Sequence, residues 1–468
     1  MESGLQELKF SRYNQKVELS GKLFLYNALT GGYASVDEEY RDNFDKCDFK
    51  KLDSMKELAE LPNAIINQLM EGGFIIPKNF DEFNVIKSMH YRGRFGANKA
   101  LTMTLIPTMN CNFRCPYCYE KDKKYPVKKM TTEVMDAIIK YVESRIDSVD
   151  HIFVTWYGGE PLLGLHEIRI MQNKLIELAS QKDVQVSGMI ITNGYGLTKE
   201  ISDELVQMQI KTAQVTIDGP EEIHNRTRFL KNGEGTYRRI INNLLQANEN
   251  LEVVIRVNIQ KENIKYVPEF VDSLKQVGID KRNNIKPYFS LVRDYEIDKG
   301  YIYSSCFSVP EFSEEESKLR QILLKKGFQP ANSNIQPKLY GCGAVSPNSI
   351  LVEPDGTLQK CWNVVGDKNE AIGNIMDIGD EFNGTLQELI NESKWYAWSE
   401  FENEDCKNCE VLPLCMGGCP YYAVKRNELF EKYHYRCTSE KYNLKNVLQE
   451  LAEEYINENL YKNEEKEV

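Results

Sequence analysis

The chain has 468 residues and a net charge of −12. Its length predicts two or three domains, and its negative charge argues against nucleic acid or an anionic membrane as the main partner. The first residues lack the basic and apolar segments of an export signal, and no apolar run reaches membrane-spanning length, so we expect a cytoplasmic protein. Twelve cysteines in such a protein favour metal ligands over disulfides.

Residues 1–98 are predicted to form a winged-helix-like unit. Its expected elements are strands Leu8–Phe10 and Leu23–Tyr26, a returning strand Tyr33–Val36, a helix from Ser54 to Leu69 that Gly72 and Gly73 stop, a strand Phe74–Pro77 and a helix Asp81–Tyr91. This order resembles the peptide-recognition domain of many ribosomal-peptide tailoring enzymes, which binds the leader peptide as an extra strand. The alternative is an N-terminal extension that only packs on the next domain.

Residues 99–300 alternate between strands and helices, which is typical of a parallel α/β sheet. Six strands are too few for a closed eightfold barrel, so we expect a partial (β/α)6 TIM barrel with ligands at the carboxyl ends of its strands. The expected strands are Leu101–Pro107, Ile152–Tyr157, Gly188–Thr192, Ala213–Ile217, Val253–Asn258 and Ile285–Val292, and the helices are Thr131–Val142, Ile168–Ala179, Thr198–Met208, Thr236–Ala247 and Val267–Val277.

Cys111, Cys115 and Cys118 follow the first of these strands with the spacing C-x3-C-x2-C. Three thiolates can hold a [4Fe–4S] cubane and leave one iron open. A zinc site or a ferredoxin-like cluster is the alternative, but either would need a fourth ligand nearby. With Tyr119 after the last cysteine, the spacing resembles the radical S-adenosylmethionine (SAM) enzymes. The resemblance implies that SAM binds the open iron and is cleaved to methionine and a 5′-deoxyadenosyl radical, which abstracts hydrogen from a substrate.

The next strand ends carry further motifs of that family. Gly158-Gly159-Glu160-Pro161 resembles its G-G-E-P motif, which binds the SAM amino group, and paired glycines allow a close backbone approach. Arg228 is the candidate for the SAM carboxylate by resemblance, with Arg226 as an alternative, and Asn225 stands where the family usually has Asp. An inward structural hydrogen bond is the other interpretation of Arg228 and Asn258. The residues expected to bind SAM are Gly158, Gly159, Glu160, Pro161, Thr192, Asn193, Thr216, Arg228 and Asn258.

Residues 301–340 are expected to form a bridge that contains a polar helix, Phe312–Lys326. A hairpin follows, with strands Ser349–Val352 and Thr357–Cys361 around the turn at Asp355 and Gly356.

Seven cysteines after residue 340 include the run C-x2-C-x5-C-x3-C and resemble the SPASM domain of peptide- and protein-modifying radical SAM enzymes, here residues 341–440. The resemblance implies two auxiliary [4Fe–4S] clusters, so that three clusters and SAM are the expected cofactors. Zinc knuckles are the alternative. By position, one cluster is bound by Cys406, Cys409, Cys415 and Cys437, and the other by Cys342, Cys361 and Cys419.

The second of these sets lacks a fourth cysteine. Cys306 is a candidate for that ligand, and otherwise an open iron there could bind a substrate thiolate. Cys47 is expected to be an ordinary thiol of the N-terminal unit. In residues 441–468 a helix, Ser439–Asn459, is expected to cap the barrel, with Lys462–Val468 frayed.

Taken with the resemblance, the sequence predicts a radical SAM maturase that acts on a ribosomally synthesised precursor peptide with a leader and forms intramolecular thioether links. Carbon–carbon cross-linking and anaerobic sulfatase maturation, which forms formylglycine, are alternative reactions. A non-catalytic metal-binding scaffold is the alternative from another class. A low-potential donor such as ferredoxin or flavodoxin is the expected electron source, by analogy with the family.

Overall fold

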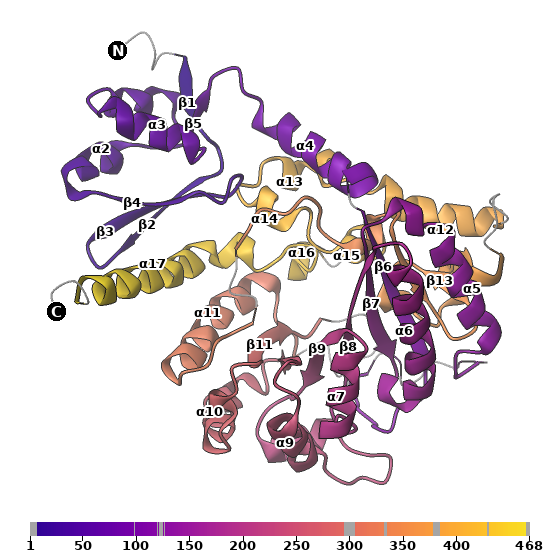
Figure 1. The fold of residues 1–468 in the computed structure, drawn as a ribbon. Coiled ribbons are helices and arrows are strands. Elements are labelled where there is room, and N and C mark those ends of the chain that lie inside the picture. The colour runs from indigo at the N-terminus through magenta and orange to yellow at the C-terminus, as the bar shows by residue number, and fades with distance from the viewer. Residues whose placement is uncertain are drawn as a thin grey trace.

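The structure, a computed structural model, describes residues 7–97, 99–118, 120, 125, 127–293, 305–331, 335–377, 384–427 and 430–464. Tyr119 and the end of the predicted frayed tail, residues 465–468, lie outside the described residues. The chain forms an N-terminal unit, a central sheet with helices along its outer side, and a cysteine-rich C-terminal part beside that sheet (Figure 1).

The strands of the N-terminal unit form two small antiparallel sheets. One has the order β2-β3-β4, and the other pairs β1 with β5. The hairpin of β3 and β4 confirms the prediction, whereas β2 was not predicted. The strands are β1 (Leu8–Phe10), β2 (Asn14–Leu19), β3 (Lys22–Asn27), β4 (Tyr33–Val36) and β5 (Ile75–Pro77).

The helix predicted to start at Ser54 is wrong over its first half. A 3₁₀ segment covers Leu52–Leu58. The α-helix α3 begins only after it and spans Asn63–Glu71. Pro62 separates the two because it lacks an N–H and disfavours helical backbone in the residue before it. The predicted stop is confirmed, since Gly73 follows α3 in the left-handed region with a φ of 77°.

Two further helices belong to the N-terminal part. The short helix α2 (Arg41–Lys46) was not predicted. The predicted helix near residue 81 is confirmed as α4 (Glu82–Arg92). It begins there because the Asp81 carboxylate accepts a hydrogen bond from the Asn84 N–H at 3.0 Å and so caps the first turn. The chain leaves α4 towards the central sheet (Figure 1).

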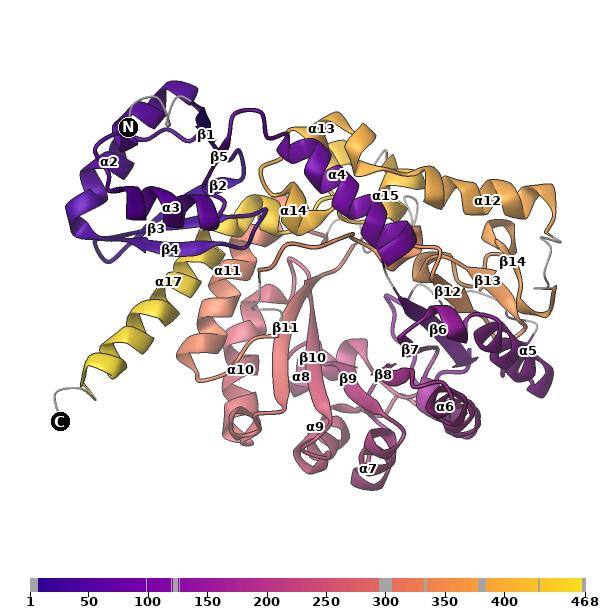
Figure 2. The same ribbon diagram turned by 45° about the horizontal axis from the view of Figure 1, so that its top comes forward.

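The central sheet has nine strands in the order β11-β10-β9-β8-β7-β6-β12-β13-β14. Its first six strands in space are parallel, which confirms the predicted α/β class. Helices follow their outer side (Figure 2). The parallel strands are β6 (Ala100–Thr108), β7 (His151–Gly158), β8 (Gln185–Thr192), β9 (Ile210–Thr216), β10 (Glu252–Ile259) and β11 (Ile285–Leu291), and the helices are α5 (Thr132–Glu143), α6 (Leu165–Ser180), α7 (Lys199–Gln207), α8 (Glu221–Thr227), α9 (Tyr237–Gln246) and α10 (Val267–Gln276).

The predicted hairpin after residue 348 is confirmed, and it extends this sheet on the far side of β6. β12 (Ser349–Val352) pairs in parallel with β6, an arrangement that the sequence did not predict. β13 (Thr357–Gln359) returns antiparallel through Gly356, whose φ of 86° suits glycine, and β14 (Gly373–Asn374) adds the last strand.

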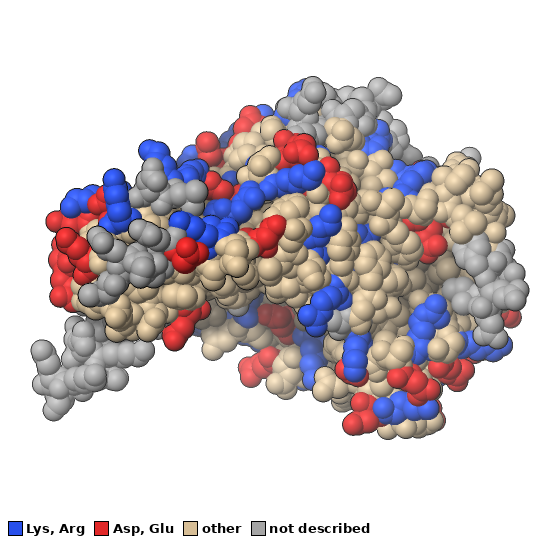
Figure 3. Space-filling model, turned by 90° about the horizontal axis from the view of Figure 1, so that it is seen from above, with Lys and Arg blue, Asp and Glu red and all other residues tan. Residues whose placement is uncertain are grey.

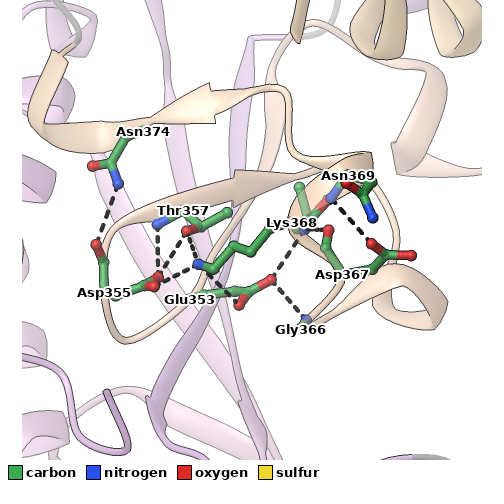
Figure 4. A network of polar contacts seen from close by, with 9 residues as sticks. Glu353, Asp355, Thr357, Gly366, Asp367, Lys368, Asn369 and Asn374 are labelled. Carbon is green, nitrogen blue, oxygen red and sulfur yellow. Dashed lines mark hydrogen bonds and ion pairs between the residues drawn. The ribbon is translucent and has the colours of Figure 1, made fainter. Parts of the chain in front are cut away.

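A polar network fixes the shape of this hairpin (Figure 4). The Lys368 ammonium donates to the Asp355 carboxylate and to the Thr357 hydroxyl, on both sides of the turn. The Glu353 carboxylate is buried and accepts from the Gly366 N–H at 2.9 Å. Because these bonds close the loop after β13 onto the hairpin, they hold the segment that contains Cys361.

The last helix does not cap the barrel as expected. Helix α17 (Glu440–Glu464) lies between α11 (Val309–Lys325) and strand β2 of the N-terminal unit (Figure 1). The buried Glu450 carboxylate accepts from the Arg320 guanidinium at 2.8 and 2.9 Å, and apolar side chains of α17 and β2 share one cluster. These contacts join three parts of the chain, and the sequence pattern of one helix could not reveal them.

Short helices make up most of the cysteine-rich part. None of the helices in the described ranges combines the length and apolar content that crossing a membrane requires. The short helices are α12 (Leu386–Ala397), α13 (Glu404–Lys407), α14 (Leu412–Cys415), α15 (Pro420–Val424) and α16 (Phe430–Tyr433).

Arg94 joins the segment after α4 to the C-terminal part. Its side chain is 1% exposed. Its guanidinium donates to four backbone carbonyls, those of Val345 at 2.7 Å, Trp395 at 3.1 Å, Tyr396 at 2.9 Å and Trp398 at 2.9 Å. One buried side chain therefore satisfies acceptors on two separate C-terminal segments.

We expect Arg94→Ala to lower the free energy of unfolding by about 3 kcal/mol, because it leaves buried carbonyls without donors. A urea titration followed by intrinsic fluorescence measures the change. Arg92→Ala is the matched control, since Arg92 is exposed on the same segment. Equal stability of the two variants would contradict this role of Arg94.

Candidate functional site

The loop that contains the first three cysteines leaves the carboxyl end of β6. Backbone bonds pin it to the segment after α8: the Arg114 N–H donates to the Phe229 carbonyl at 2.9 Å, and the Lys231 N–H donates to the Asn112 carbonyl at 3.0 Å. Within the loop, the Cys118 N–H donates to the Cys115 carbonyl at 3.2 Å. The backbone of the cysteine loop is therefore fixed from outside as well as within itself.

The three thiols of this loop lie close enough to influence one another. Burial raises the pKa of Cys111 to about 11 and that of Cys118 to about 12, and the neighbouring Cys115 contributes to both shifts. Burial also raises the pKa of Cys115. Such thiols stay protonated until a metal displaces their protons, and three converging sulfurs fit the donor set of an iron–sulfur cluster.

Gly158 and Gly159 lie where the end of β7 passes the cysteine loop. A Cβ at Gly158 would lie 2.5 Å from the Thr108 carbonyl oxygen, and one at Gly159 would lie 2.5 Å from the Asn110 carbonyl oxygen. The close approach that the paired glycines permit is thus an approach of two backbone segments. Any side chain here would push the cysteine loop away from β7.

Glu160 connects the ends of two strands. Its carboxylate is 2% exposed and accepts from the Thr192 hydroxyl at 2.6 Å, from the Asn193 N–H at 2.7 Å and from the Leu162 N–H at 3.0 Å. Burial raises the pKa of Glu160, and these donors oppose that shift. Pro161 opens the short 3₁₀ turn after it. Glu160 therefore orders the site, and whether it also binds a ligand stays a prediction.

Asn193 extends this network to the cysteine loop. Its side-chain amide donates to the Asn112 side-chain oxygen at 2.8 Å. Through this bond the predicted residues Glu160, Thr192 and Asn193 are brought together with the loop of Cys111.

A second network, which the sequence did not reveal, lies on the other side of the loop. The Tyr117 hydroxyl donates to the Asp218 carboxylate at 2.5 Å and accepts from the Arg228 guanidinium at 2.7 Å. Burial alone would lower the pKa of Arg228, but Tyr117, Cys115 and Asp218 hold it above its usual range. The Nε of Arg228 is buried and has no hydrogen-bond partner among the described residues. Arg228 thus retains a donor that a ligand could use.

His224 and Asn225 both contact Thr236 at the start of α9, and the Thr236 hydroxyl donates to the Arg228 carbonyl at 2.7 Å. The Asn225 side-chain oxygen accepts from the Thr236 and Tyr237 N–H groups at 2.8 and 3.1 Å, which caps α9. An amide oxygen therefore does the work that a carboxylate would do at this position. His224 Nε2 lies 3.0 Å from the Thr236 hydroxyl, and burial, together with Arg228, lowers the pKa of His224.

Thr216 and Asn258 lie on the neighbouring strands β9 and β10. Thr216 is the register partner of Arg256, and the Asn258 side-chain oxygen accepts from Arg256 Nε at 2.9 Å. The Asn263 amide donates to the Asn258 carbonyl at 2.8 Å and to the Asp218 carbonyl at 3.3 Å. Asn258 thus makes the structural bond considered above, and Thr216 lies beside Arg256 in the sheet.

The C-terminal cysteines fall into two groups. Cys342, Cys361 and Cys419 form one group. Burial is the main cause that raises the pKa of Cys342 and of Cys361, and the nearby Cys419 thiol raises both further. Cys406, Cys409, Cys415 and Cys437 form the other, where burial and then neighbouring thiols raise the pKa of Cys406 to about 12. Within the described ranges, no three His, Cys, Asp or Glu side chains meet closely enough to hold a single metal ion.

Cys306 is buried just before α11. The neighbouring Ser305 carbonyl accepts from the Lys261 N–H at 2.9 Å, so this segment lies beside the loop after β10. The contacts of the described residues do not decide whether Cys306 joins Cys342, Cys361 and Cys419, so its role as a ligand stays a prediction. Cys47 is buried in the N-terminal unit, where its Sγ lies 3.1 Å from the Asn43 carbonyl oxygen.

A cavity of about 670 Å³ lies between the inner side of the sheet and the C-terminal part. Trp362 lines this cavity. Its ring stacks on that of Tyr157, near the end of β7, with 5.1 Å between the ring centroids. The cavity therefore reaches from the strand with the G-G-E-P motif to the segment of Cys361. Representative lining residues are Thr102, Thr104, Arg256, Tyr288, Cys342 and Cys361.

Comparisons with known proteins agree with this geometry. Residues 105–274 match the Radical SAM superfamily. The radical SAM cyclopropyl synthase TigE of Paramaledivibacter caminithermalis is 22% identical over 448 residues, which span 88% of this chain and 90% of that protein. The cysteine-type anaerobic sulfatase-maturating enzyme of Clostridium novyi is 24% identical over 69% of this chain and 88% of its own.

A solved structure has a similar fold. Native anSMEcpe with bound AdoMet and Cp18Cys peptide aligns with a TM-score of 0.56 and 19% identity, covering 75% of this chain and 98% of that chain. At this identity the likeness concerns the fold alone.

Tyr117→Phe tests the second network. Without the hydroxyl, Arg228 and Asp218 lose their shared partner, so we expect SAM cleavage to 5′-deoxyadenosine to slow about tenfold. Anaerobic assays with dithionite measure the rate, and iron analysis checks that cluster content is retained. Tyr266→Phe is the matched control, because the Tyr266 hydroxyl makes no hydrogen bond to any residue that the structure describes. An unchanged rate would argue against a functional network.

Proposed function

The chain is a radical SAM enzyme, and we propose that it modifies a ribosomally synthesised precursor peptide by forming intramolecular thioether links. The radical SAM match at residues 105–274 supports the first part. The observation that carries the second part is the cavity, because Thr155 of β7 and the thiols of Cys342 and Cys361 all line it. A peptide in this cavity would reach both.

We assign residues 99–300 to SAM binding. Cys111, Cys115 and Cys118 would hold a [4Fe–4S] cluster, which when bound supplies the electron that cleaves SAM to the hydrogen-abstracting radical. Arg228 would bind the SAM carboxylate through its remaining donor, and Asn258 would present its amide N–H groups beside it. The tight fit around Gly158 and Gly159 would keep the cysteine loop in place.

We assign residues 341–440 to two auxiliary clusters. Cys406, Cys409, Cys415 and Cys437 would hold one, and Cys342, Cys361 and Cys419 the other, in agreement with the two thiol groups. A site with three thiolates leaves a position for a substrate thiolate, unless Cys306 fills it. A thioether would then form with the net loss of two hydrogens from the peptide: a hydrogen atom is taken from carbon, the thiol releases its proton, and the electron that remains would need an auxiliary cluster as its acceptor.

We assign residues 1–98 to leader recognition. Strand β4 is an edge strand of the sheet β2-β3-β4, and an edge strand can pair with an extended peptide. A groove of about 630 Å³ also lies between this unit and the loop of Cys409, and Arg12, Lys16 and Lys51 line it. Basic and acidic side chains alternate on the face seen in Figure 3. Leader binding would raise the local concentration of the modified segment.

Sulfatase maturation is the second candidate, because enzymes named for it match this chain over two thirds of its length or more. That reaction would convert a Cys or Ser to formylglycine, which an aldehyde-reactive hydrazide detects. The two proposals therefore differ in product and can be separated by one experiment.

The first expected outcome concerns SAM cleavage. Cys115→Ala should abolish 5′-deoxyadenosine formation, and iron should fall from about twelve to about eight per chain as one cluster is lost. Anaerobic reconstitution, iron and sulfide analysis and chromatography of the products measure both. Cys47→Ala is the control, since this cysteine lies in the N-terminal unit. Retained SAM cleavage by Cys115→Ala would refute the cluster assignment.

The second expected outcome concerns the product. A candidate cysteine-containing precursor is co-expressed anaerobically with the protein, treated with a thiol alkylator and weighed by mass spectrometry. We expect loss of two hydrogens per link and protection of the linked cysteine from alkylation. The same loss with every cysteine alkylated would indicate a carbon–carbon link instead, and a hydrazide-reactive product would indicate formylglycine.

A further inference from the structure

The inner faces of β10 and β11 carry polar side chains in register. Arg256 lies opposite Tyr288, and Asn258 lies opposite Ser290. The intervening residues of both strands are buried and apolar. Of these polar side chains, Arg256, Tyr288 and Ser290 line the 670 Å³ cavity. The sheet thus presents a strongly cationic group inside the space that we assign to the substrate.

Other charged groups of the cavity have partners within the protein. Arg320 is neutralised by the Glu450 carboxylate at 2.8 Å. Lys360 is buried and donates to the carbonyls of Ser346 and Ser349, each at 2.6 Å. Arg293 lies over two tyrosine rings.

The two acids of the cavity are also engaged. Glu316 accepts from the Asn443 amide at 3.2 Å, and Glu440 pairs with Lys338 at 3.8 Å. Neither of these contacts uses Arg256.

Arg256 differs from these groups. Its Nε donates to the Asn258 side-chain oxygen at 2.9 Å, and its two terminal nitrogens bond to no described residue. It has no carboxylate partner among the described residues either. In an open cavity water can solvate this guanidinium, but a peptide that fills the cavity would remove that water. A cation left unpaired in this way would oppose binding of the peptide.

We propose that Arg256 binds the carboxylate of an acidic side chain, Asp or Glu, in the modified segment of the peptide substrate. A planar guanidinium with two free terminal nitrogens suits a carboxylate, which accepts both bonds side by side. The inference rests on the proposed function, since it names the class of peptide that the same cavity accepts.

The position of Arg256 favours a peptide carboxylate over the carboxylate of SAM. Arg228, beside Cys115, has its own remaining donor for SAM. Arg256 precedes Asn258 by two residues, so it lies further from the carboxyl end of β10, and it borders the cavity that Cys342 and Cys361 also line. An acidic residue bound there would fix the register of the peptide beside Cys342 and Cys361.

Selection from an mRNA-displayed library of random linear peptides tests the proposal. The probe library is bound anaerobically to the reconstituted holoenzyme with SAM, for the wild type, Arg256→Gln, Arg256→Lys and Tyr288→Phe. Glutamine keeps a donor for Asn258 and removes the charge, lysine keeps the charge, and Tyr288→Phe changes the same cavity without altering charge. Iron content and circular dichroism check that each variant is folded and loaded.

We expect the wild type and Tyr288→Phe to enrich peptides with Asp or Glu at one position, and Arg256→Gln to lose that preference. For a selected peptide, replacing the acid by its amide should weaken wild-type binding about tenfold and leave binding to Arg256→Gln unchanged. Arg256→Lys should keep part of the preference for an acidic residue. This expectation can be tested even if Arg256→Gln proves unstable.

Two results would overturn the inference and are distinguishable. If the wild type binds peptides without an acidic preference, or if Arg256→Gln keeps the preference, then Arg256 does not bind the carboxylate although the proposed function stands. If the wild type enriches no peptide, the proposed function fails and the inference fails with it. Equilibrium dialysis with labelled SAM adds a third reading, since loss of SAM binding in both Arg256 variants would assign the guanidinium to SAM instead.

Discussion

Hydrogen bonding of β6 to two parallel neighbours is the constraint on which the rest of the structure depends. On one side β6 pairs with β7, and on the other it pairs with β12. The end of β6 leads into the loop of Cys111, and the hairpin that begins with β12 leads to Cys361. Because a slip of one residue would turn every side chain to the opposite face, this pairing fixes how the two thiol groups are placed relative to each other.

Buried charged side chains then lock the segments that surround this core. Arg94, Glu160 and Arg228 are each buried and each bond to groups that are distant in the sequence. Burial of a charge costs free energy unless its bonding partners are in place, so such groups favour one arrangement and disfavour the others. In this chain they hold the N-terminal segment on the C-terminal part, β7 on β8, and the cysteine loop on the segment after β9.

The sequence predicts what depends on local pattern, and it misses what depends on long-range pairing. The six parallel strands were predictable because apolar runs alternate with amphipathic helices between Leu101 and Val292. The Tyr117 network was not, since its three members lie on separate segments and hydroxyl bonds leave no periodic signal. The sequence also misses the parallel pairing of β12 with β6 and the position of α17 on β2, because both join segments that are far apart in the chain. The break before α3 was predictable in principle, because Pro62 is visible in the sequence.

On β10 and β11, most of the residues that stabilise the fold differ from the residues that line the cavity. On β10 and β11 every second residue is a buried apolar side chain, and the packing of these residues determines the fold. Of the residues between them, Arg256, Tyr288 and Ser290 line the cavity, so a change at Arg256 or Tyr288 would alter the cavity wall while the buried apolar set stays intact. Relatives 22% and 24% identical, one named for cyclopropyl synthesis and the other for sulfatase maturation, align with this chain over 90% and 88% of their own length. Function in this chain must therefore be argued from the cavity and its cysteines, since the fold alone does not select one reaction.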